Sequence, residues 1–329
     1  MAAPFATVGI ISIGQMGLGV AKLLVAHNYR VLTNVANRSA ATQTRAHDAR
    51  LGLVNSDAEL VAECDYILSI VPPRDAVETA RRMVDALCSS SPSPQRASTW
   101  PLYYLDLNAI APSTVSSIAK MLSQNAPHVR FVDGGIIGGP PSQQANSTSW
   151  TRPGIPLSGS HPLHEAPVNG AHLAETLNSR YIGPKVGSAS GLKCCFAALS
   201  KGMTALALQA FSTASALDVL PHLQTYLDEY NPKGGERAAK GIVGCPPKAY
   251  RWVEEMHQIG NCFAEDGGWS EQARIFRQIA GVYEGLASVV EKRGGVAGMG
   301  NVEGAIDALR EGLEEDRAMM NDELERDDQ

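Results

Sequence analysis

The chain has 329 residues, 44% of them hydrophobic and 19% charged, which is the composition of a soluble globular protein long enough for two domains. A formal net charge of −6 with no basic run excludes a nucleic-acid partner, which would need a basic face. Six cysteines without C-x-x-C spacing or a Cys/His cluster predict reduced thiols and no metal site, and with no secretory signal visible we expect a cytoplasmic protein.

The first half alternates short apolar runs with helical patterns, which predicts a doubly wound, mostly parallel sheet covered on both faces. The predicted strands are Thr7–Ile13, Tyr29–Val35, Tyr66–Val71, Tyr103–Asn108, Val129–Asp133 and Ile155–Ser158. The predicted helices between them are Leu18–His27, Ala40–Ala49, Asp57–Ala62, Asp75–Cys88 and Ser113–Gln124. Residues 89–99 and 142–153 are predicted loops.

Strand signals stop near residue 184, and helical patterns follow. The stretch from Ser190 to about Leu220 predicts one long helix, and Tyr250–Cys262, Glu271–Glu291 and Val302–Ala318 predict three more. The acidic tail from residue 314 is expected to be a frayed end or a solvated helix. The Ala, Ser and Thr content of 202–220 favours a helix buried on most faces over a membrane span. We therefore predict an α/β domain over residues 1–186 and an all-α domain over 187–329.

The opening of the chain is an apolar run, a glycine turn and a helix-forming stretch. In that order, backbone N–H groups at a helix N-terminus hold a dinucleotide pyrophosphate. The G-x-G-x-x-G pattern is imperfect because Ser12 stands at its first glycine, so an ordinary strand-to-helix turn is the alternative. The predicted cofactor-binding residues here are Ile13, Gly14, Gln15, Met16 and Gly17.

The end of the second strand predicts which dinucleotide binds. An NAD site has Asp or Glu about 20 residues after the glycine turn. This chain has Asn37, Arg38 and Ser39 there, and no acidic residue before Asp48. A guanidinium can bind a ribose 2′-phosphate in a bidentate contact, so these three residues predict NADP(H). The alternative is a surface arginine that follows a strand.

Two further strand ends are predicted to meet the cofactor. Val71, Pro72 and Pro73 turn the chain after one strand, because proline cannot extend a central strand. Asn108 ends the next, and its amide offers a donor and an acceptor to the nicotinamide region or to substrate. A plain strand exit and a turn-forming asparagine are the alternatives.

A glycine-rich segment and a lysine predict the substrate site. Four glycines bracket two isoleucines in residues 134–139, where exposed N–H groups could bind an oxyanion, so Ile137, Gly138 and Gly139 are predicted to contact substrate. Lys193 lies at the start of the long apolar helix, where burial and the helix dipole would lower its pKa and suit acid/base catalysis. A lysine that reaches solvent is the alternative, and Lys201 is a rival or a helper.

Together these segments resemble the 6-phosphogluconate dehydrogenase-like superfamily, in its β-hydroxyacid dehydrogenase branch. Residues 13–17 resemble that family's G-L-G-x-M-G, residues 37–39 its N-R-[ST], residues 133–139 its D-A-P-V-S-G-G and residues 187–193 its G-x-G-x-x-x-K. Residues 250–257 resemble an R-W-x-x-E-M segment of a poorly characterised helical domain. The resemblance implies an NADP-binding Rossmann domain, then a helical substrate and dimerisation domain.

The departures from the family concern the substrate. Ile137 replaces a serine, Ala189 a glycine, and Phe196 and Ala197 the asparagines that usually follow the lysine. These replacements predict a less polar pocket, which fits a larger or more apolar compound than a small hydroxy acid. We also expect Lys201, Arg251, Glu255 and His257 to contact substrate, although Arg251 and Glu255 could be an ordinary i,i+4 pair.

The resemblance implies hydride transfer between nicotinamide C4 and a carbinol or carbonyl carbon, with Lys193 exchanging the hydroxyl proton. Two alternatives stay open, an NADPH-dependent imine reductase and a non-catalytic NADP(H)-binding regulatory protein. The partners expected are a small-molecule substrate and a second copy of the chain in a homodimer, because the long apolar helix exceeds what one domain would cover. No membrane partner is expected.

Overall fold

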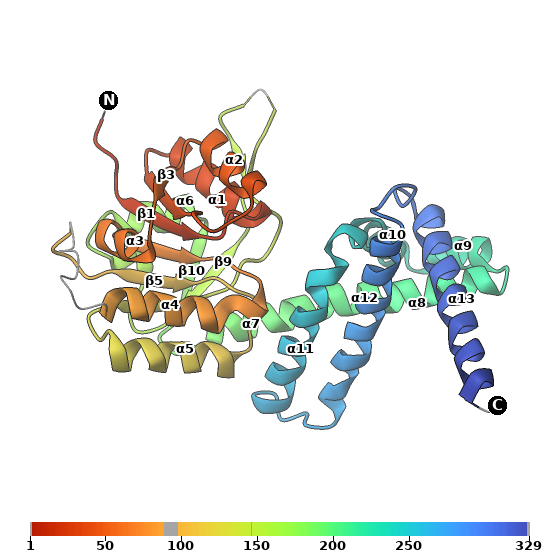
Figure 1. Cartoon of the computed structure of the whole chain (residues 1–329). Helices are drawn as coiled ribbons and strands as arrows, with labels where there is room; N and C mark the ends of the chain where they lie inside the picture. Colours follow the sequence, from red (N-terminus) through yellow and green to blue (C-terminus); the bar gives the residue numbers. More distant parts are fainter. Residues whose placement is uncertain (1, 89–97, 146, 328–329) are drawn as a thin grey trace. The chain divides into compact units, whose positions relative to one another are not determined.

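The computed structural model describes residues 2–88, 98–145 and 147–327, without the side chains of 316, 317 and 319–327. It divides into two compact units, Met1–Cys194 and Cys195–Gln329. Figure 1 shows the α/β architecture of the first and the helices of the second, so the predicted fold class is confirmed. The predicted loop at 89–99 lies almost wholly outside the described residues. The predicted domain boundary after residue 186 falls just before the helix in which the two units divide.

The first unit is built on an eight-stranded sheet in the order β10-β9-β6-β5-β4-β1-β2-β3. All neighbouring strands in it are parallel except β6 and β9. Its strands are β1 (Thr7–Ile11), β2 (Arg30–Asn34), β3 (Gly52–Val54), β4 (Tyr66–Ser69), β5 (Tyr103–Asp106), β6 (Arg130–Gly134), β9 (Ile155–Ser158) and β10 (Ser179–Gly183). Strands β2 and β3 lie on one side of β1, and strands β4, β5 and β6 lie on the other. The strand order therefore reverses beside β1, and doubly wound sheets bind ligands at such a reversal.

Helices cover both faces of this sheet. They are α1 (Gln15–Ala26), α2 (Ala40–Asp48), α3 (Asp57–Glu63), α4 (Ala76–Cys88), α5 (Pro112–Asn125) and α6 (Gly170–Thr176). Leu24 of α1 and Leu173 of α6 share a buried cluster with Val8 and Ile10 of β1, whereas α3, α4 and α5 share another with Ile11 and Ile67. Alternate residues of β1 therefore face opposite layers, as both-sided burial requires.

Five helices and strands of the first unit were not predicted. The edge strands β3 and β10 are short or largely exposed, so neither carries a continuous apolar run. Helix α6 has seven residues and begins after Asn169, whose φ of 53° is typical of a turn. The predicted loop at 142–153 contains a small hairpin, β7 (Ser142–Gln143) with β8 (Trp150–Thr151). Short 3-10 turns lie at Pro73–Asp75 and Leu163–Glu165.

The second unit is helical throughout its described residues. Its helices are α8 (Met203–Ala216), α9 (Leu220–Tyr230), α10 (Pro232–Gly244), α11 (Ala249–Glu265), α12 (Ile275–Lys292) and α13 (Val302–Asp327), with 3-10 turns at Pro246–Lys248 and Gln272–Arg274. The sequence prediction missed α9 and α10, in which Pro221 and Pro232 occupy the first turn, where proline's missing N–H costs nothing. Helix α13 continues through the predicted frayed tail.

The predicted helix from 190 to 220 is present as one continuous helical stretch over Ser188–Ala216, with a π-helical turn inside it. Helix α7 (Ser188–Ala197) is followed by a π-helical turn (Ala198–Gly202) and then α8, and the chain breaks at Asp218, whose φ is 56°. Ser188–Ala216 is long and apolar enough to cross a membrane by length and composition, yet α8 packs one face on α10, α12 and α13. The opposite face is exposed, so the expectation of burial on most faces is wrong.

Candidate functional site

The turn after β1 keeps a glycine-type backbone although its first glycine is absent. Ser12 adopts a φ of 78°, a conformation that glycine favours and that costs other residues free energy. Gly17 fits beneath it, because a Cβ there would lie 2.0 Å from the Ser12 carbonyl oxygen. The serine therefore keeps the backbone shape of the motif at the cost of strain.

The residues predicted to bind cofactor at this turn can do so mainly through the backbone. The Ile13 side chain is buried in the core, and Gln15 is exposed. Gly14 precedes α1, where no side chain caps the helix and no acidic residue lies in the first turn. A Cβ on Gly14 would meet only the Ser12 Oγ, at 3.9 Å, so space is open in front of these N–H groups. An anionic pyrophosphate fits there.

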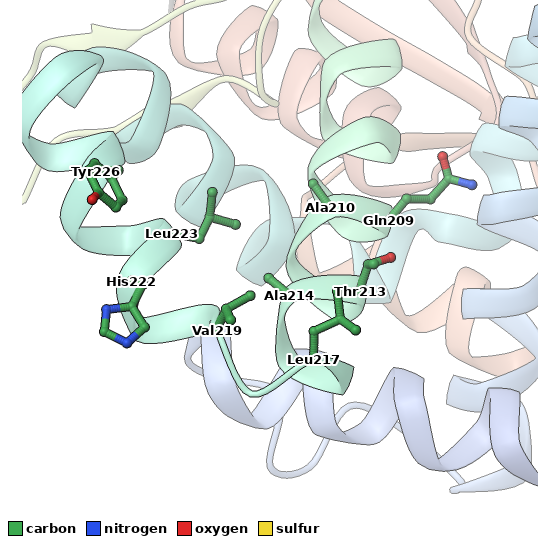
Figure 2. Close-up of a pocket in the computed structure, with 9 residues that line it drawn as sticks. All are labelled: Gln209, Ala210, Thr213, Ala214, Leu217, Val219, His222, Leu223 and Tyr226. Carbon is green, nitrogen blue, oxygen red and sulfur yellow. The ribbon is translucent and has the colours of Figure 1, made fainter.

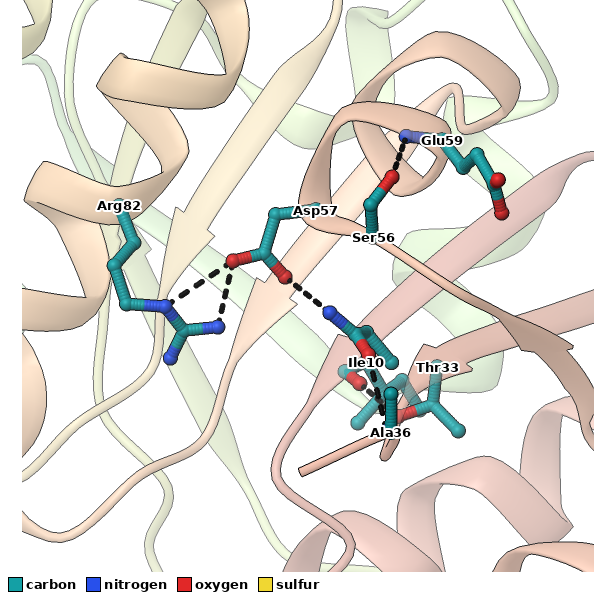
Figure 3. A network of polar contacts seen from close by, with 8 residues as sticks. Ile10, Thr33, Ala36, Ser56, Asp57, Glu59 and Arg82 are labelled. Atoms are coloured by element: carbon teal, nitrogen blue, oxygen red, sulfur yellow. Dashed lines mark hydrogen bonds and ion pairs between the residues drawn. The ribbon is translucent and has the colours of Figure 1, made fainter. Parts of the chain in front are cut away.

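A carboxylate that was not predicted from the sequence lies next to the end of β2. Asp57, at the start of α3, accepts a hydrogen bond from Asn34 Nδ2 at 2.9 Å and pairs with Arg82 at 2.6 Å (Figure 3). Asp57 therefore lies close to the end of β2 in space, although it is far past the expected position in sequence. Both of its oxygens are already bonded, and the side chain is 18% exposed.

Asn37, Arg38 and Ser39 lie beyond this network and are exposed. Ser39 precedes α2 without capping it, and its Oγ lies 3.1 Å from Thr42 Oγ1. Helix α2 has no acidic residue in its first turn, and Arg45 contacts the same Thr42 hydroxyl at 2.9 Å. A guanidinium beside a helix N-terminus without acidic residues is an arrangement that can hold a phosphate.

Asn108 holds a neighbouring loop. Its Oδ1 accepts from the Val71 N–H at 2.7 Å and its Nδ2 donates to Ser69 Oγ at 3.0 Å, with the side chain buried. The amide expected to meet nicotinamide or substrate is therefore used to fix the Val71 end of the Val71–Pro73 loop. Pro72 is exposed, and Pro73 starts a 3-10 turn.

A buried polar row crosses the sheet at the ends of its strands. Ser69, Asp106, Asp133 and Ser158 are neighbours in register on β4, β5, β6 and β9. Burial raises the pKa of Asp106, hydrogen bonds from Asn108 oppose the shift and the Asp133 charge adds to it, so that the resulting pKa is about 7. Asp106 therefore titrates near neutral pH instead of in the usual carboxylate range.

Asp106 makes the stability of the protein depend on pH. Its folded-state pKa is raised, so its contribution is full below about pH 4 and is lost as pH rises through 7. We expect Asp106→Asn to flatten this fall in the free energy of unfolding, because the amide cannot ionise. Urea unfolding between pH 5 and pH 8 measures it, with the exposed Asp48→Asn as control. An unchanged slope in Asp106→Asn would contradict the assignment.

The glycine segment after β6 is only partly open. The N–H groups of Gly135 and Ile137 already donate to the carbonyls of Pro156 and Gly154, at 3.2 and 2.9 Å, so these two cannot bind an oxyanion as expected. Gly138 has a φ of 123° against Pro153, and a side chain on Gly139 would meet nothing within 4 Å. Open backbone is therefore confined to the end of the segment.

Lys193 lies directly against this segment. Its Nζ donates to the Ile136 carbonyl at 2.6 Å, and its side chain is partly buried. A Cβ on Gly135 would approach the Lys193 Cβ to 2.7 Å, so the glycine lets the lysine stem lie flat on the strand end. The structure thus brings Lys193 together with Gly135 and Ile136 at the carboxyl end of β6.

The remaining predicted site residues form a cluster in the second unit. Lys201, in the π-helical turn, is paired with Glu255 of α11, and its Nζ lies 5.0 Å from the centre of the Trp252 ring. The side chains of Lys201 and Glu255 are only 13% and 12% exposed. Glu255 therefore pairs with Lys201, and the alternative Arg251–Glu255 pair is wrong.

Arg251 and His257 contribute less to this cluster. Within the described ranges, the buried Arg251 Nε has no hydrogen-bond partner, and His257 is half-buried on the same helix. Tyr283 was not predicted to lie here; it is a buried residue whose hydroxyl donates to the Lys201 carbonyl and whose ring meets Trp252 edge to face. The second unit thus holds a largely buried ion pair beside the Trp252 ring.

Comparison with known proteins identifies both parts of the chain. Residues 7–150 match the NAD binding domain of 6-phosphogluconate dehydrogenase, and residues 214–286 match a domain of unknown function (DUF1932). Residues 7–150 therefore form a domain of the NAD-binding family found in 6-phosphogluconate dehydrogenase. It is also 25% identical over 254 residues to an uncharacterized 28.5 kDa protein of Methanothermus fervidus, a match of 75% of this chain and 88% of that one.

Solved structures share the fold of this chain. A conserved hypothetical protein from Sinorhizobium meliloti has a TM-score of 0.62 at 18% identity, covering 94% of this chain and 97% of that one. A 3-hydroxyisobutyrate dehydrogenase from Mycobacterium tuberculosis has 0.58 at 14%, covering 93% and 99%. An imine reductase from Myxococcus stipitatus, in complex with NADP+, has 0.51 at 17%, covering 92% and 99%. A variant of that reductase is in complex with NAD+. The matched domain is thus an NAD binding domain, and a dehydrogenase and a reductase are among the proteins that share this fold.

Proposed function

We propose that the protein is an NADP(H)-dependent oxidoreductase that transfers hydride between nicotinamide C4 and a hydroxyl or carbonyl carbon of a small organic substrate. The observation that carries the proposal is the placement of Lys193, whose ammonium is held at the strand end by the Ile136 carbonyl. That edge of the sheet also carries the glycine turn at residues 12–17. A proton-transferring group and a dinucleotide-binding turn thus belong to the same edge.

Bound NADP(H) would accept or supply the hydride. The α1 N-terminus and Gly14 would hold its pyrophosphate, and Asn37, Arg38 and Ser39 its 2′-phosphate. During oxidation the neutral Lys193 amine would take the proton of the substrate hydroxyl as its carbon loses a hydride, and during reduction the Lys193 ammonium would return a proton to the carbonyl oxygen. Asn108 would act by holding the Val71–Pro73 loop in place.

The cofactor preference is tested at Arg38. We expect Arg38→Ser to raise the KM for NADPH about tenfold or more and leave that for NADH nearly unchanged, because a charge-assisted contact to the 2′-phosphate is lost. Arg81→Ser, which removes an exposed arginine of α4 paired with Glu78, is the matched control. Preference of the unmodified protein for NADH would overturn the assignment.

Imine reduction is the second candidate. The less polar residues Ile137 and Ala197 replace groups that bind substrate hydroxyl and carboxyl in β-hydroxyacid dehydrogenases, and solved imine reductases share the fold. A screen of NADPH oxidation against aldehydes, 3-keto acids and cyclic imines separates the two. Turnover of imines alone would favour the second candidate. Cofactor binding without turnover of any compound would favour a regulatory protein.

We also propose that two copies form a homodimer in the cytoplasm, without a membrane or nucleic-acid partner. In the second unit, Phe196, Leu199, Met203 and Leu206 form an exposed apolar row at helical spacing, each 49% exposed or more. On α8 and α9, Ala214 and Leu223 line an apolar groove (Figure 2). Light scattering should give twice the mass of one chain, and a monomer at micromolar concentration would contradict the proposal.

A further inference from the structure

A single buried carboxylate ties the start of α7 to the sheet. Asp133 of β6 is fully buried. Its Oδ2 accepts from the Ser158 hydroxyl at 2.8 Å and from the N–H groups of Gly187 and Ala189 at 2.8 and 3.1 Å. The Ser190 N–H reaches the same oxygen at 3.3 Å, and the Ser190 hydroxyl donates to Oδ1 at 2.6 Å. The carboxylate therefore takes five donors, four of them from the start of α7.

These contacts give hydrogen-bond acceptors to the N–H groups at the start of α7. The first N–H groups of a helix have no partner within it, and negative charge is favourable beside them. In α7 they donate to the Asp133 carboxylate of β6. The Ser158 Oγ is a further acceptor, for the Ala189 N–H at 3.0 Å. The position of α7 on the sheet is thus set by Asp133.

The same strand end and the same helix are joined a second time. Ser190 bonds to Asp133, and three residues further along each segment Lys193 bonds to Ile136. Residues three apart lie on one side of a helix. The two bonds are therefore successive links between the end of β6 and α7. The Ser190–Asp133 bond sets the position along the strand end at which Lys193 meets the Ile136 carbonyl.

We propose that Asp133, acting through Ser190, is a positioning residue for the Lys193 ammonium. The proposal rests on the proposed role of Lys193 as acid and base. Without the Ser190 link, the backbone N–H bonds still hold α7, but the helix can turn about its axis and the Lys193 Nζ leaves the Ile136 carbonyl. A purely structural Asp133 would instead affect stability and leave the lysine environment unchanged.

The test compares Ser190→Ala, Ser190→Thr and the control Ser117→Ala, whose hydroxyl bonds within α5. Ser190→Ala removes one hydrogen bond and keeps the backbone contacts, so the protein should fold, and Asp133→Asn serves as a stronger but riskier variant. The first readout needs no substrate: acetic anhydride labelling of Lys193 relative to the exposed Lys185, measured by mass spectrometry. We expect Ser190→Ala to raise this ratio about threefold or more, and Ser190→Thr to restore it.

The second readout is turnover. On a substrate of the native protein, kcat of Ser190→Ala should fall about tenfold or more with the KM for NADPH unchanged, and Ser190→Thr should regain most of it. An unchanged labelling ratio in Ser190→Ala would overturn the positioning role, whatever the activity. A raised ratio in a protein that turns over no substrate would support the positioning and count against the proposed function alone. Failure of the positioning role can therefore be distinguished from failure of the proposed oxidoreductase function.

Discussion

Replacing Lys193 with methionine is expected to lower kcat by about 10²- to 10⁴-fold, the contribution typical of a positioned acid or base. Methionine keeps the Cβ and Cγ that lie against Gly135, so the packing beneath the glycine segment is preserved. What is lost is the ammonium that reaches the Ile136 carbonyl. Binding of NADPH, followed by fluorescence titration, should be unchanged because the proposed dinucleotide contacts lie at α1 and α2.

Lys185→Met is the matched control for this substitution. It removes an exposed lysine from the turn that precedes α7 and should leave kcat within about twofold, as surface changes usually do. The catalytic assignment fails if Lys193→Met turns over a verified substrate at the native rate while it binds NADPH normally. A variant that no longer binds NADPH would instead show that Lys193 supports the cofactor site.

Replacing Glu255 with glutamine is expected to destabilise the protein by about 3–5 kcal/mol, because the Lys201 ammonium is then left buried without its counter-charge. Both side chains are nearly enclosed, and a contact with the Trp252 face stabilises a cation much less than a carboxylate does. Urea unfolding followed by tryptophan fluorescence measures the loss. The double variant Lys201→Met with Glu255→Gln should recover most of it, since no buried charge then remains.

Glu311→Gln provides the comparison at the surface. Its partner Arg293 lies at 2.8 Å, yet the Glu311 side chain is 65% exposed, so its removal should cost less than about 1 kcal/mol. Equal losses for Glu255→Gln and Glu311→Gln would mean that the Lys201–Glu255 pair is solvated in solution. A double variant no more stable than the single one would mean that the packing around Trp252 requires the charges.

The central strands of the sheet and helices α1 to α5 could be predicted because their apolar runs are long and continuous. All six predicted strands exist, each within two residues of its predicted start. What escaped prediction lies where burial is small: β3 has three residues, and β10 exposes Tyr181 and Ile182. Helices α9 and α10 also escaped prediction, although Pro221 and Pro232 lie in their first turns, where proline is favoured.

The site was predictable in its composition and less so in its contacts. Lys193 was placed beside the glycine segment by resemblance, and the structure brings the two into contact. The pairing of Lys201 with Glu255 could not be inferred, because it joins segments 54 residues apart through tertiary packing. Asp57 was missed for the same reason: a search limited to the residues after β2 cannot find a carboxylate supplied by α3.

The central place of β1 has a consequence for synthesis on the ribosome. Val8 pairs with Val31 on one side and with Tyr66 on the other. Strand β1 is made first, and its partner β4 is made 58 residues later. At about 5–20 residues per second, one edge of β1 stays open for roughly 3–12 s. A nascent chain that stops before residue 66 lacks the strand that flanks the dinucleotide turn, and we expect it not to retain NADPH.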